Sequence, residues 1–197
     1  MNDETINENQ LNRKNKIKKD IVIIAILIVA LLLAYFATNV WLSVHIVKNV
    51  SMQNTLNDGD IIWADKIASP KRGEVVIFAY DEDTDYVKRV IAVEGDTLYF
   101  DKKGDKYEVY IKYKGNDLKE LLEEPYLSEG VITACTTNST FVIQEGEVFV
   151  MGDNREESYD SRDFGPIKKE QIKGVVHNFF ISIKGFTKSI YSSSCAK

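Results

Sequence analysis

The sequence predicts a mainly β protein that follows a single N-terminal transmembrane helix. Two features of the chain support this fold class. A long uncharged run occupies residues 21–42, and beyond it the apolar residues come in short segments rich in Val, Ile, Phe and Tyr. Gly and Asp separate these segments, as they separate strands joined by turns. We therefore expect a tail at 1–20, a membrane anchor at 21–44 and an antiparallel β-sheet domain at 45–197.

The uncharged run has the length and the flanks of a transmembrane helix. As a helix it would rise about 33 Å, enough to cross a hydrocarbon core of about 30 Å. Basic residues fill the segment "RKNKIKK" (13–19) before it, and Tyr35 and Trp41 lie near its far end, where aromatic rings favour the lipid interface. Because basic flanks stay in the cytoplasm, we expect a single pass through the cytoplasmic membrane, with the β domain extracytoplasmic.

A cleaved signal peptide is the alternative interpretation of this run. The apolar region of a signal peptide is usually shorter and ends at a small-x-small cleavage site. Here the nearest candidate, "AYFA" (34–37), has Tyr35 where a small residue is required. An uncleaved anchor is therefore favoured, preceded by a polar segment, residues 1–12, that is expected to be disordered.

The domain contains six segments with strand composition and one with helical spacing. The segment "NDLKELLEE" (116–124) predicts a short helix, which Pro125 would end. No internal repeat interrupts the pattern, so a single domain is expected. The predicted strands are 74–80, 85–93, 97–100, 107–113, 140–144 and 147–152.

Composition disfavours several classes of function. The net charge is −5 and no basic block lies outside the N-terminal segment, so nucleic-acid binding is not expected. Cys135 and Cys195 are too few for a disulfide framework or a zinc site, and the sequence leaves open whether they pair. His45 and His177 do not form a His-Glu-x-x-His motif. No metal or cofactor is therefore predicted, and the oligomeric state stays open.

Ser51 stands in a strip of small and turn-forming residues, "NVSMQNTLNDGD" (49–60), soon after the anchor. A serine becomes a nucleophile only when a positioned base takes its proton. His45 lies at the expected membrane edge, and His177 lies in a predicted strand, where a lone histidine usually has a structural role. The remaining candidate for the base is a lysine.

Lys88 is the lysine with the most apolar surroundings. In the segment "DYVKRVIAV" (85–93), strand alternation places Lys88 on one face with Tyr86, Val90 and Ala92, and Arg89 on the other with Val87, Ile91 and Val93. Burial lowers the pKa of a lysine and can leave it neutral near pH 7. A lysine that snorkels to the surface would have the same sequence pattern, so the pattern alone leaves the role of Lys88 open.

With these two residues in view, the chain resembles the bacterial type I signal peptidases, membrane-bound Ser-Lys endopeptidases that remove signal peptides from exported preproteins. The resemblance is an ordered series that follows an N-terminal anchor and covers nearly the whole chain beyond the polar tail. The matching segments are "VSMQNTLNDGD" (50–60), "RGEVVIF" (72–78), "YVKRVIAVEGD" (86–96), "EEPYL" (123–127) and "VMGDNREESYDSRDFGPI" (150–167).

The resemblance implies roles for individual residues. Ser51 would be the nucleophile and Lys88 the general base, a known variant of the nucleophile-base pair. Ser158 would orient the Lys88 amine. A supporting ion pair would form between Asp160 and Arg162, with Asp153 adding further support near the site. Without the rest of the series, this last segment would be taken for a solvated, turn-rich loop.

Two positions depart from the family pattern. Asn49 stands two places before the nucleophile, where the family usually has Ser or Gly, and Asn54 stands where it usually has Pro. The family's serine donates to the oxyanion beside the backbone N–H of the nucleophile. Since asparagine can also donate there, Asn49 is the candidate donor together with the Ser51 N–H. The loss of proline at 54 removes a fixed φ angle.

The implied activity is cleavage of preproteins after an Ala-x-Ala site at the outer face of the membrane, with no cofactor. Met52 and strand 74–80 are candidates for the pockets that take small side chains. Trp63 and Ile61–Ile62 would either enter the lipid interface or join the core.

Two other functions stay open from sequence. One is a dedicated peptidase for a single exported substrate class, such as pilin or spore-coat precursors. The other is a non-catalytic, membrane-tethered β domain that binds exported proteins. Self-cleaving repressor proteases are disfavoured by the anchor, and a serine β-lactamase would need lysine at position 54.

Overall fold

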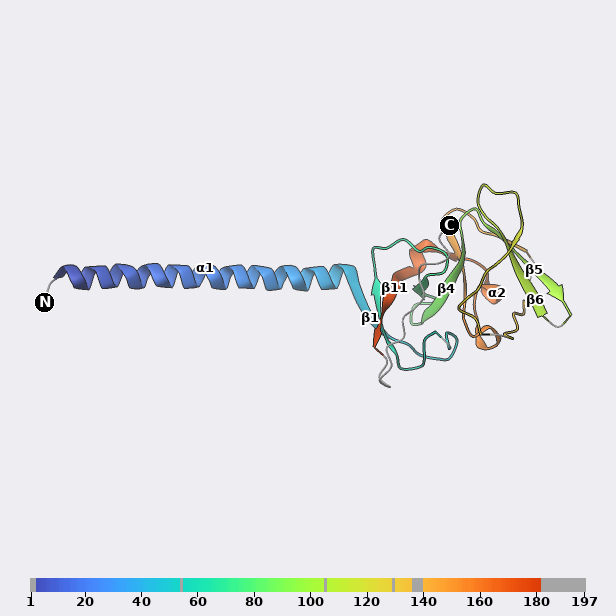
Figure 1. Cartoon of the computed structure of the whole chain (residues 1–197), viewed down its shortest axis with the longest axis horizontal. Helices are drawn as coiled ribbons and strands as arrows, with labels where there is room; N and C mark the ends of the chain where they lie inside the picture. Colours follow the sequence, from blue (N-terminus) through green and yellow to red (C-terminus); the bar gives the residue numbers. More distant parts are fainter. Residues whose placement is uncertain (1–2, 54, 105, 129, 136–139, 182–197) are drawn as a thin grey trace. The chain divides into compact units, whose positions relative to one another are not determined.

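The computed structural model of the chain describes residues 3–53, 55–104, 106–128, 130–135 and 140–181. It divides into two units after Trp41. The first unit is one helix, α1 (Asp3–Trp41), which Figure 1 shows as an unbroken coil. The polar segment 1–12, expected to be disordered, is therefore helical from Asp3. Extending an existing helix adds a hydrogen bond for each residue ordered, and acidic residues near the N-terminus favour the helix dipole.

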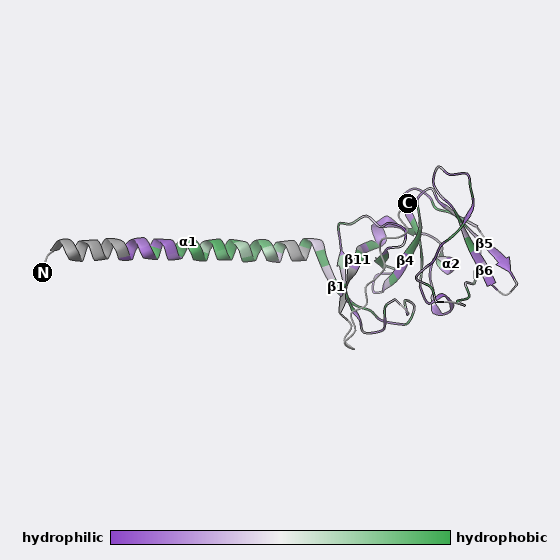
Figure 2. Cartoon of the chain, in the orientation of Figure 1, coloured by the Kyte–Doolittle hydropathy of each residue, from purple (hydrophilic) through white to green (hydrophobic). Residues whose placement is uncertain are grey.

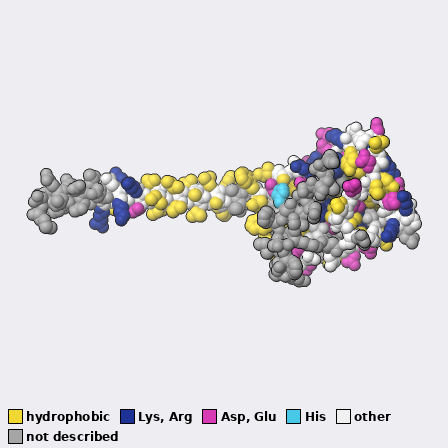
Figure 3. Space-filling view, in the orientation of Figure 1, with side chains coloured by type: hydrophobic (Ala, Val, Ile, Leu, Met, Phe, Trp, Pro, Cys, Tyr) yellow, Lys and Arg dark blue, Asp and Glu magenta, His cyan; other side chains and the backbone are white. Residues whose placement is uncertain are grey.

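Part of α1, Arg13–Phe36, is long and apolar enough to cross a membrane. Figure 3 shows Lys and Arg side chains gathered on α1 just before its hydrophobic stretch, and Figure 2 shows the same change in hydropathy along the helix. The helix ends at Trp41, because Leu42–Ile46 forms strand β1 and pairs with β2 (Ile61–Asp65). The last residues assigned to the anchor at 21–44 thus belong to the second unit.

The strands of the second unit that the structure describes form two antiparallel sheets, which confirms the mainly β fold class. The first sheet has the order β1-β2-β11-β3-β4-β9-β10, with β3 (Val75–Ala79), β4 (Asp85–Val93), β9 (Glu147–Met151), β10 (Ile167–Lys168) and β11 (Ile172–Ile181). The second has the order β7-β6-β5-β8, with β5 (Thr97–Lys103), β6 (Lys106–Lys112), β7 (Glu120–Leu121) and β8 (Thr140–Val142). The short helices are η1 (Arg155–Glu157), α2 (Ser161–Phe164) and η2 (Lys169–Gln171).

All six segments predicted as strands are strands in the structure, and the segment that contains His177 forms β11. The predicted helix at 116–124 is wrong. Its residues Glu120–Leu121 form the edge strand β7, which pairs with β6, and Leu122 N donates to Val109 O at 2.9 Å. A segment this short gains little from helix formation alone, so pairing with a ready sheet edge prevails.

Three apolar clusters fill the core of the second unit. One lies between the segment after β1 and strands β2, β3 and β11, and another lies on the opposite face of the same sheet, as the alternating burial of Val75 and Val76 shows. The third packs the second sheet against β4 and β9 and contains Phe100 and Phe149. The first two clusters cover both faces of β3 and β4, so a side chain on either face of β4 meets apolar neighbours.

The alternation of side chains between the two faces of β4 reverses at one point. Tyr86 and Val90 pack in the same cluster, as expected for residues that share a face with Lys88, but Ala92 lies in the cluster of the second sheet. The pairing of β4 with β9 shifts register between Val90 and Ala92. Because an extra residue in a strand turns the following side chains to the other face, the expected placement of Ala92 beside Lys88 is wrong.

Candidate active site

Ser51 lies in a loop of residues 47–60 between β1 and β2, here called the Ser51 loop. Two hydrogen bonds close its base, from Val47 N to Asp60 O (2.8 Å) and from Gly59 N to Val47 O (2.9 Å). Met52 and Leu56 anchor it, because both side chains are almost fully buried in the cluster against β2 and β3. Met52 is therefore a core residue, and it is absent from the lining of the cleft described below.

Asn49 adopts a left-handed backbone conformation with φ of 79°, the one positive φ among the described non-glycine residues. Its N–H donates to Asp58 Oδ1 at 3.0 Å. Asparagine tolerates this conformation better than most residues, and glycine has no cost there. The backbone therefore explains why asparagine can occupy a position where the resembling family has a small residue.

Lys88 lies in the middle of β4, opposite Val76 of β3, and is 3% exposed. Burial lowers the pKa of Lys88 to about 8, and the charges of Asp160 and Arg162 act on it in opposite directions. Among the residues that the structure describes, no carboxylate forms an ion pair with Lys88, and its Nζ lies 5.5 Å from the centre of the Tyr86 ring. About a tenth of the Lys88 amine is thus neutral at pH 7.

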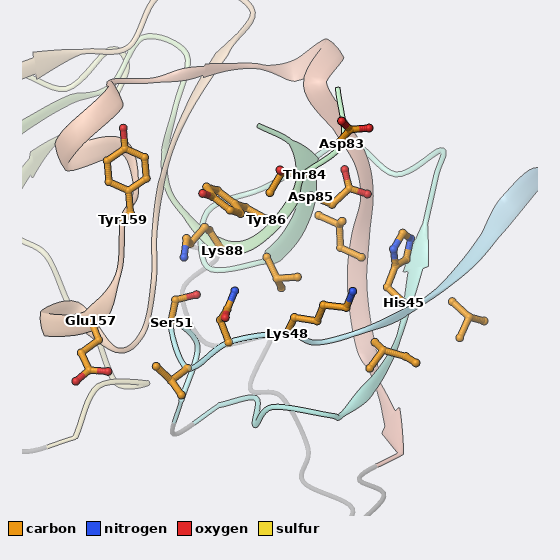
Figure 4. A pocket seen from close by; sticks show the side chains of 16 residues that line it. His45, Lys48, Ser51, Asp83, Thr84, Asp85, Tyr86, Lys88, Glu157 and Tyr159 are labelled. Atoms are coloured by element: carbon orange, nitrogen blue, oxygen red, sulfur yellow. The ribbon is translucent and has the colours of Figure 1, made fainter. Parts of the chain in front are cut away.

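Ser51 and Lys88 line the same cleft, which has a volume of about 770 Å³. Figure 4 shows the Lys88 side chain extended toward Ser51, beneath the Tyr86 ring, while His45 and Lys48 lie farther along the cleft. The amine of a buried lysine and a serine hydroxyl thus share one open site. The other lining residues are Val44, Ile46, Asn49, Val50, Ile77, Asp83, Thr84, Asp85, Val87, Glu157 and Tyr159.

Behind the cleft, Ser158, Asp160 and Arg162 form a buried hydrogen-bonded group. Ser158 Oγ donates to Asp160 Oδ2 (2.6 Å), and the guanidinium of Arg162 donates to both oxygens of Asp160 (2.8 and 2.9 Å). Burial alone would raise the pKa of Asp160, but the hydrogen bonds and charge of Arg162 lower it overall. Since the Ser158 hydroxyl donates its proton to Asp160, the lone pairs of its oxygen can accept a hydrogen bond from an amine.

Asp153 pairs with Arg89 rather than with a group of the cleft. Arg89 Nε and Nη2 donate to the two oxygens of Asp153 at 2.9 and 2.6 Å, and both side chains are 1% exposed. Arg89 follows Lys88 in β4 and points to the opposite face. The support expected from Asp153 stays a prediction, because its hydrogen bonds go to Arg89, the neighbour of Lys88 in β4.

Gly152 lets two parts of the site approach each other. A Cβ atom at Gly152 would overlap Ser158 Oγ and the backbone oxygen of Ser51. The next turn also holds the loop, because Asn154 N donates to Ser51 O at 3.0 Å. The absence of a side chain at 152 thus brings the Ser51 loop against the segment that carries Ser158.

The structure separates the two histidines considered as bases. His45 lines the cleft from β1, and its Nε2 hydrogen-bonds with Ser43 Oγ at 2.9 Å. His177 lies outside the cleft lining and is 3.5 Å from Asp65 Oδ2. Ile62 is buried, whereas Trp63 is 37% exposed. Of the residues singled out in the sequence, Asn54 and Cys195 lie outside the described part of the chain, so the pairing of Cys135 stays open.

Sequence reasoning missed several residues of the site. Lys48, Thr84, Asp85 and Tyr159 line the cleft, although nothing in their local pattern marks them as functional. Glu124 forms an ion pair with the buried Arg155. That pair explains why the "EEPYL" segment accompanies the last block, but a contact between residues far apart in the chain has no signal in a single sequence.

Comparison with known families completes this description. The model of the family described as "Signal peptidase, peptidase S26" matches residues 20–181. This range holds the hydrophobic run of α1, the Ser51 loop, Lys88 and the Ser158 segment. The chain belongs to this family. As a member of a signal peptidase family with an N-terminal apolar helix, it is a membrane-anchored serine endopeptidase whose reaction is the cleavage of signal peptides.

The similarity to named relatives extends over most of this chain. A signal peptidase I of Bacillus licheniformis is 32% identical, covering 92% of this chain and 98% of the relative. Signal peptidase IB of Staphylococcus aureus is 35% identical, covering 67% and 74% respectively. A crystal structure of a signal peptidase I from Enterococcus faecalis V583 is 28% identical and covers 55% of this chain and 97% of its own, with a TM-score of 0.39.

Gly152→Ala should lower the turnover of this peptidase strongly and its stability only moderately. The added methyl group must push Ser158 or the Ser51 backbone away, and a displacement of about 1 Å in an active site can cost roughly 10²-fold in rate. Unfolding should become easier by about 1–3 kcal/mol, as for other overpacked sites. Turnover of a preprotein and urea unfolding measure the two effects.

Gly174→Ala is the matched control, because a Cβ at Gly174 would press on Ala64 Cβ at 2.9 Å, and Gly174 does not line the cleft. This variant should lose stability and keep its turnover. Equal turnover losses in the two variants would contradict a special role for the close approach at Gly152.

Proposed function

We propose that Ser51 is the nucleophile and Lys88 the general base of signal-peptide cleavage in this chain. The observation that carries the proposal is a buried lysine, with its pKa lowered to about 8, in the same cleft as a serine. Family membership supports it, because the S26 model spans both residues. A cleft that holds an activated hydroxyl suits the hydrolysis of a peptide bond.

The proposed reaction is an acyl transfer in two steps. Neutral Lys88 accepts the proton of the Ser51 hydroxyl while the oxygen attacks the scissile carbonyl carbon, and the protonated amine then gives this proton to the leaving amine. Water next attacks the acyl carbon while Lys88 takes one of its protons; the ester bond to Ser51 then breaks, and Lys88 returns the proton to the Ser51 oxygen. The products are the signal peptide, with a new carboxylate, and the mature protein, with a new amino group.

Ser158, Asp160 and Arg162 support the base in this proposal. Asp160 accepts the proton of the Ser158 hydroxyl, so the lone pairs of the Ser158 oxygen can accept a hydrogen bond from the Lys88 amine and hold its direction. Arg162 keeps Asp160 ionised. The opposite charges of Arg162 and Asp160 act on Lys88 with opposite signs, which leaves burial as the dominant effect on its pKa.

The oxyanion is stabilised by the backbone N–H of Ser51 together with the side chain of Asn49. Both residues line the cleft, and Asn49 is exposed, with its backbone held by Asp58. One oxyanion donor can contribute about 3 kcal/mol of transition-state stabilisation. Asn49 would thus serve in place of the serine that the family usually has there.

The membrane arrangement belongs to the same proposal. The basic segment 13–19 stays in the cytoplasm, the uncharged part of α1 that follows it spans the lipid, and the domain that begins at Leu42 faces outward. Because only a short segment joins the span to the Ser51 loop, the nucleophile acts close to the lipid surface, where signal peptides emerge. Trp63 of β2, which is 37% exposed, is proposed to contact the interface.

Cleavage of a preprotein with an Ala-x-Ala site tests the pair of residues directly. The purified full chain in detergent should cut after the second alanine, as read by mass spectrometry. Ser51→Ala and Lys88→Ala should each reduce turnover by at least about 10³-fold, as expected when a nucleophile or its base is removed.

Three other results would change the proposal. Cleavage that survives Ser51→Ala would exclude Ser51 as the nucleophile. Failure on general preproteins with cleavage of one exported class, such as pilin or spore-coat precursors, would indicate a dedicated peptidase. Binding without any cleavage would indicate a tethered binding domain.

The rate should depend on pH through Lys88, which must be neutral to act as a base. With the pKa lowered to about 8 by burial, about a tenth of the molecules are active at pH 7, and turnover should rise about tenfold per unit below pH 8. It should level off above that value. Turnover measured from pH 6 to 10 checks the curve, and Asp117→Asn, which removes an exposed carboxylate outside the cleft lining, provides a control. A midpoint near 10.5 would contradict burial of the base.

Substitutions at Asn49 should separate its side chain from its backbone. Asn49→Gly removes the amide and keeps the left-handed conformation at no cost, whereas Asn49→Ala also adds strain of roughly 1 kcal/mol. If the amide is an oxyanion donor, Asn49→Gly should lower kcat by about 10²-fold, and Asn49→Ser should recover part of it. Unchanged kcat in Asn49→Gly would exclude the side chain as a donor, whatever the effect of Asn49→Ala.

A further inference from the structure

Thr55 lies four residues after Ser51, and its hydroxyl links the Ser51 loop to the strand of the base. Thr55 Oγ1 donates to Asp153 Oδ2 at 2.5 Å and accepts from Arg89 Nη2 at 3.3 Å. Arg89 is the neighbour of Lys88 in β4. One hydroxyl therefore connects the segment that carries the nucleophile to the segment that carries the base.

The partners of this hydroxyl are held firmly. Arg89 and Asp153 form two parallel hydrogen bonds and are both 1% exposed. Arg89 Nη1 also donates to Gly73 O at 2.6 Å, and its guanidinium lies 4.2 Å from the centre of the Tyr126 ring. A buried bidentate pair with a stacked guanidinium has little freedom. Thr55 is thus attached to a fixed point of the sheet.

The Ser51 loop meets this part of the molecule at two places. Asn154 donates to the backbone oxygens of Ser51 (3.0 Å) and Val50 (3.2 Å), and Asp153 accepts from Thr55. Thr55 N also donates to the backbone oxygen of the buried Met52 at 3.0 Å. Attachment at one end alone would let the segment that carries Ser51 rotate, whereas attachment at both ends fixes its direction as well as its position.

We propose that Thr55 is a positioning residue that sets the direction of the Ser51 hydroxyl relative to Lys88. It does not line the cleft, so it acts through Asp153 and Arg89 and not on the substrate. The proposal rests on the pair Ser51 and Lys88 proposed above. Loss of the Thr55 hydroxyl should lower kcat, because proton transfer and attack need close alignment, and should leave KM nearly unchanged.

The test compares Thr55→Ser with Thr55→Ala in the full detergent-solubilised chain, using an Ala-x-Ala preprotein. Both variants lose the methyl group, and only the serine keeps the hydroxyl. Thr55→Ser should retain most of the turnover, and Thr55→Ala should lose roughly 10²-fold in kcat. The midpoint of the pH profile should stay where it is in the unchanged chain, because Lys88 remains equally buried. Thr55→Val, which keeps the side-chain volume, replaces Thr55→Ala if the latter fails to fold.

If Thr55 only stabilised the fold, another destabilising variant should lower kcat equally. Ile143→Val makes this comparison, because it removes one buried methyl group from the cluster of the second sheet, where Ile143 is 1% exposed. It should lower the midpoint of thermal unfolding and leave kcat unchanged. Thermal unfolding followed by circular dichroism establishes the folded fraction of every variant.

Three outcomes would overturn the proposal: equal kcat for the Ser and Ala variants, a loss confined to KM, or an equal loss of kcat in Ile143→Val. Ser51→Ala in the same assay separates this proposal from the one on which it rests. Cleavage by Ser51→Ala would reject the proposed pair of Ser51 and Lys88. If Ser51→Ala is inactive while Thr55→Ser and Thr55→Ala have equal kcat, only the role of Thr55 is rejected.

Discussion

The removal of Lys88 from water is the constraint on which the rest of the site depends. A fall in its pKa from 10.5 to about 8 corresponds to roughly 3 kcal/mol of free energy of unfolding. An unfolded chain binds the proton more tightly than the folded one, so stability rises with pH between about 8 and 10.5, and below that window the folded protein carries the full cost. The apolar clusters on both faces of β4 must offset this cost.

The surrounding charges are arranged so that none of them cancels the effect of burial. Asp160 lies close enough to raise the pKa of Lys88, but Arg162 is bound to Asp160 and acts in the opposite direction. Asp153 is bound to Arg89 on the other side of the strand. Asp160 and Asp153, the two carboxylates that raise the pKa of Lys88, thus each have a cation partner of their own. A carboxylate paired with Lys88 would instead hold the amine in its charged form.

The sequence predicted the parts of this arrangement that depend on local pattern. Strands such as 85–93 were recognised because their composition and alternation are local properties, and Ser51 and Lys88 were found through segments that resemble a known family. The errors have a common cause. Glu120–Leu121, inside the predicted helix at 116–124, form a strand because β6 offers an edge, and Ala92 lies away from Lys88 because the pairing of β4 with β9 shifts register. Both outcomes depend on contacts with distant parts of the chain, which a local pattern does not contain.

The adjacent pair Lys88 and Arg89 shows why the base must lie in a strand. Lys88 requires surroundings without a free carboxylate, whereas Arg89 requires one, because a guanidinium stays charged and is costly to bury unpaired. Consecutive residues of a strand point to opposite faces, so two cations that are neighbours in sequence can have opposite environments. On a helix the two side chains would lie only about 100° apart, and Asp153 would then face both. The strand therefore lets one segment supply a neutral base on one face and a charged anchor for the Ser51 loop on the other.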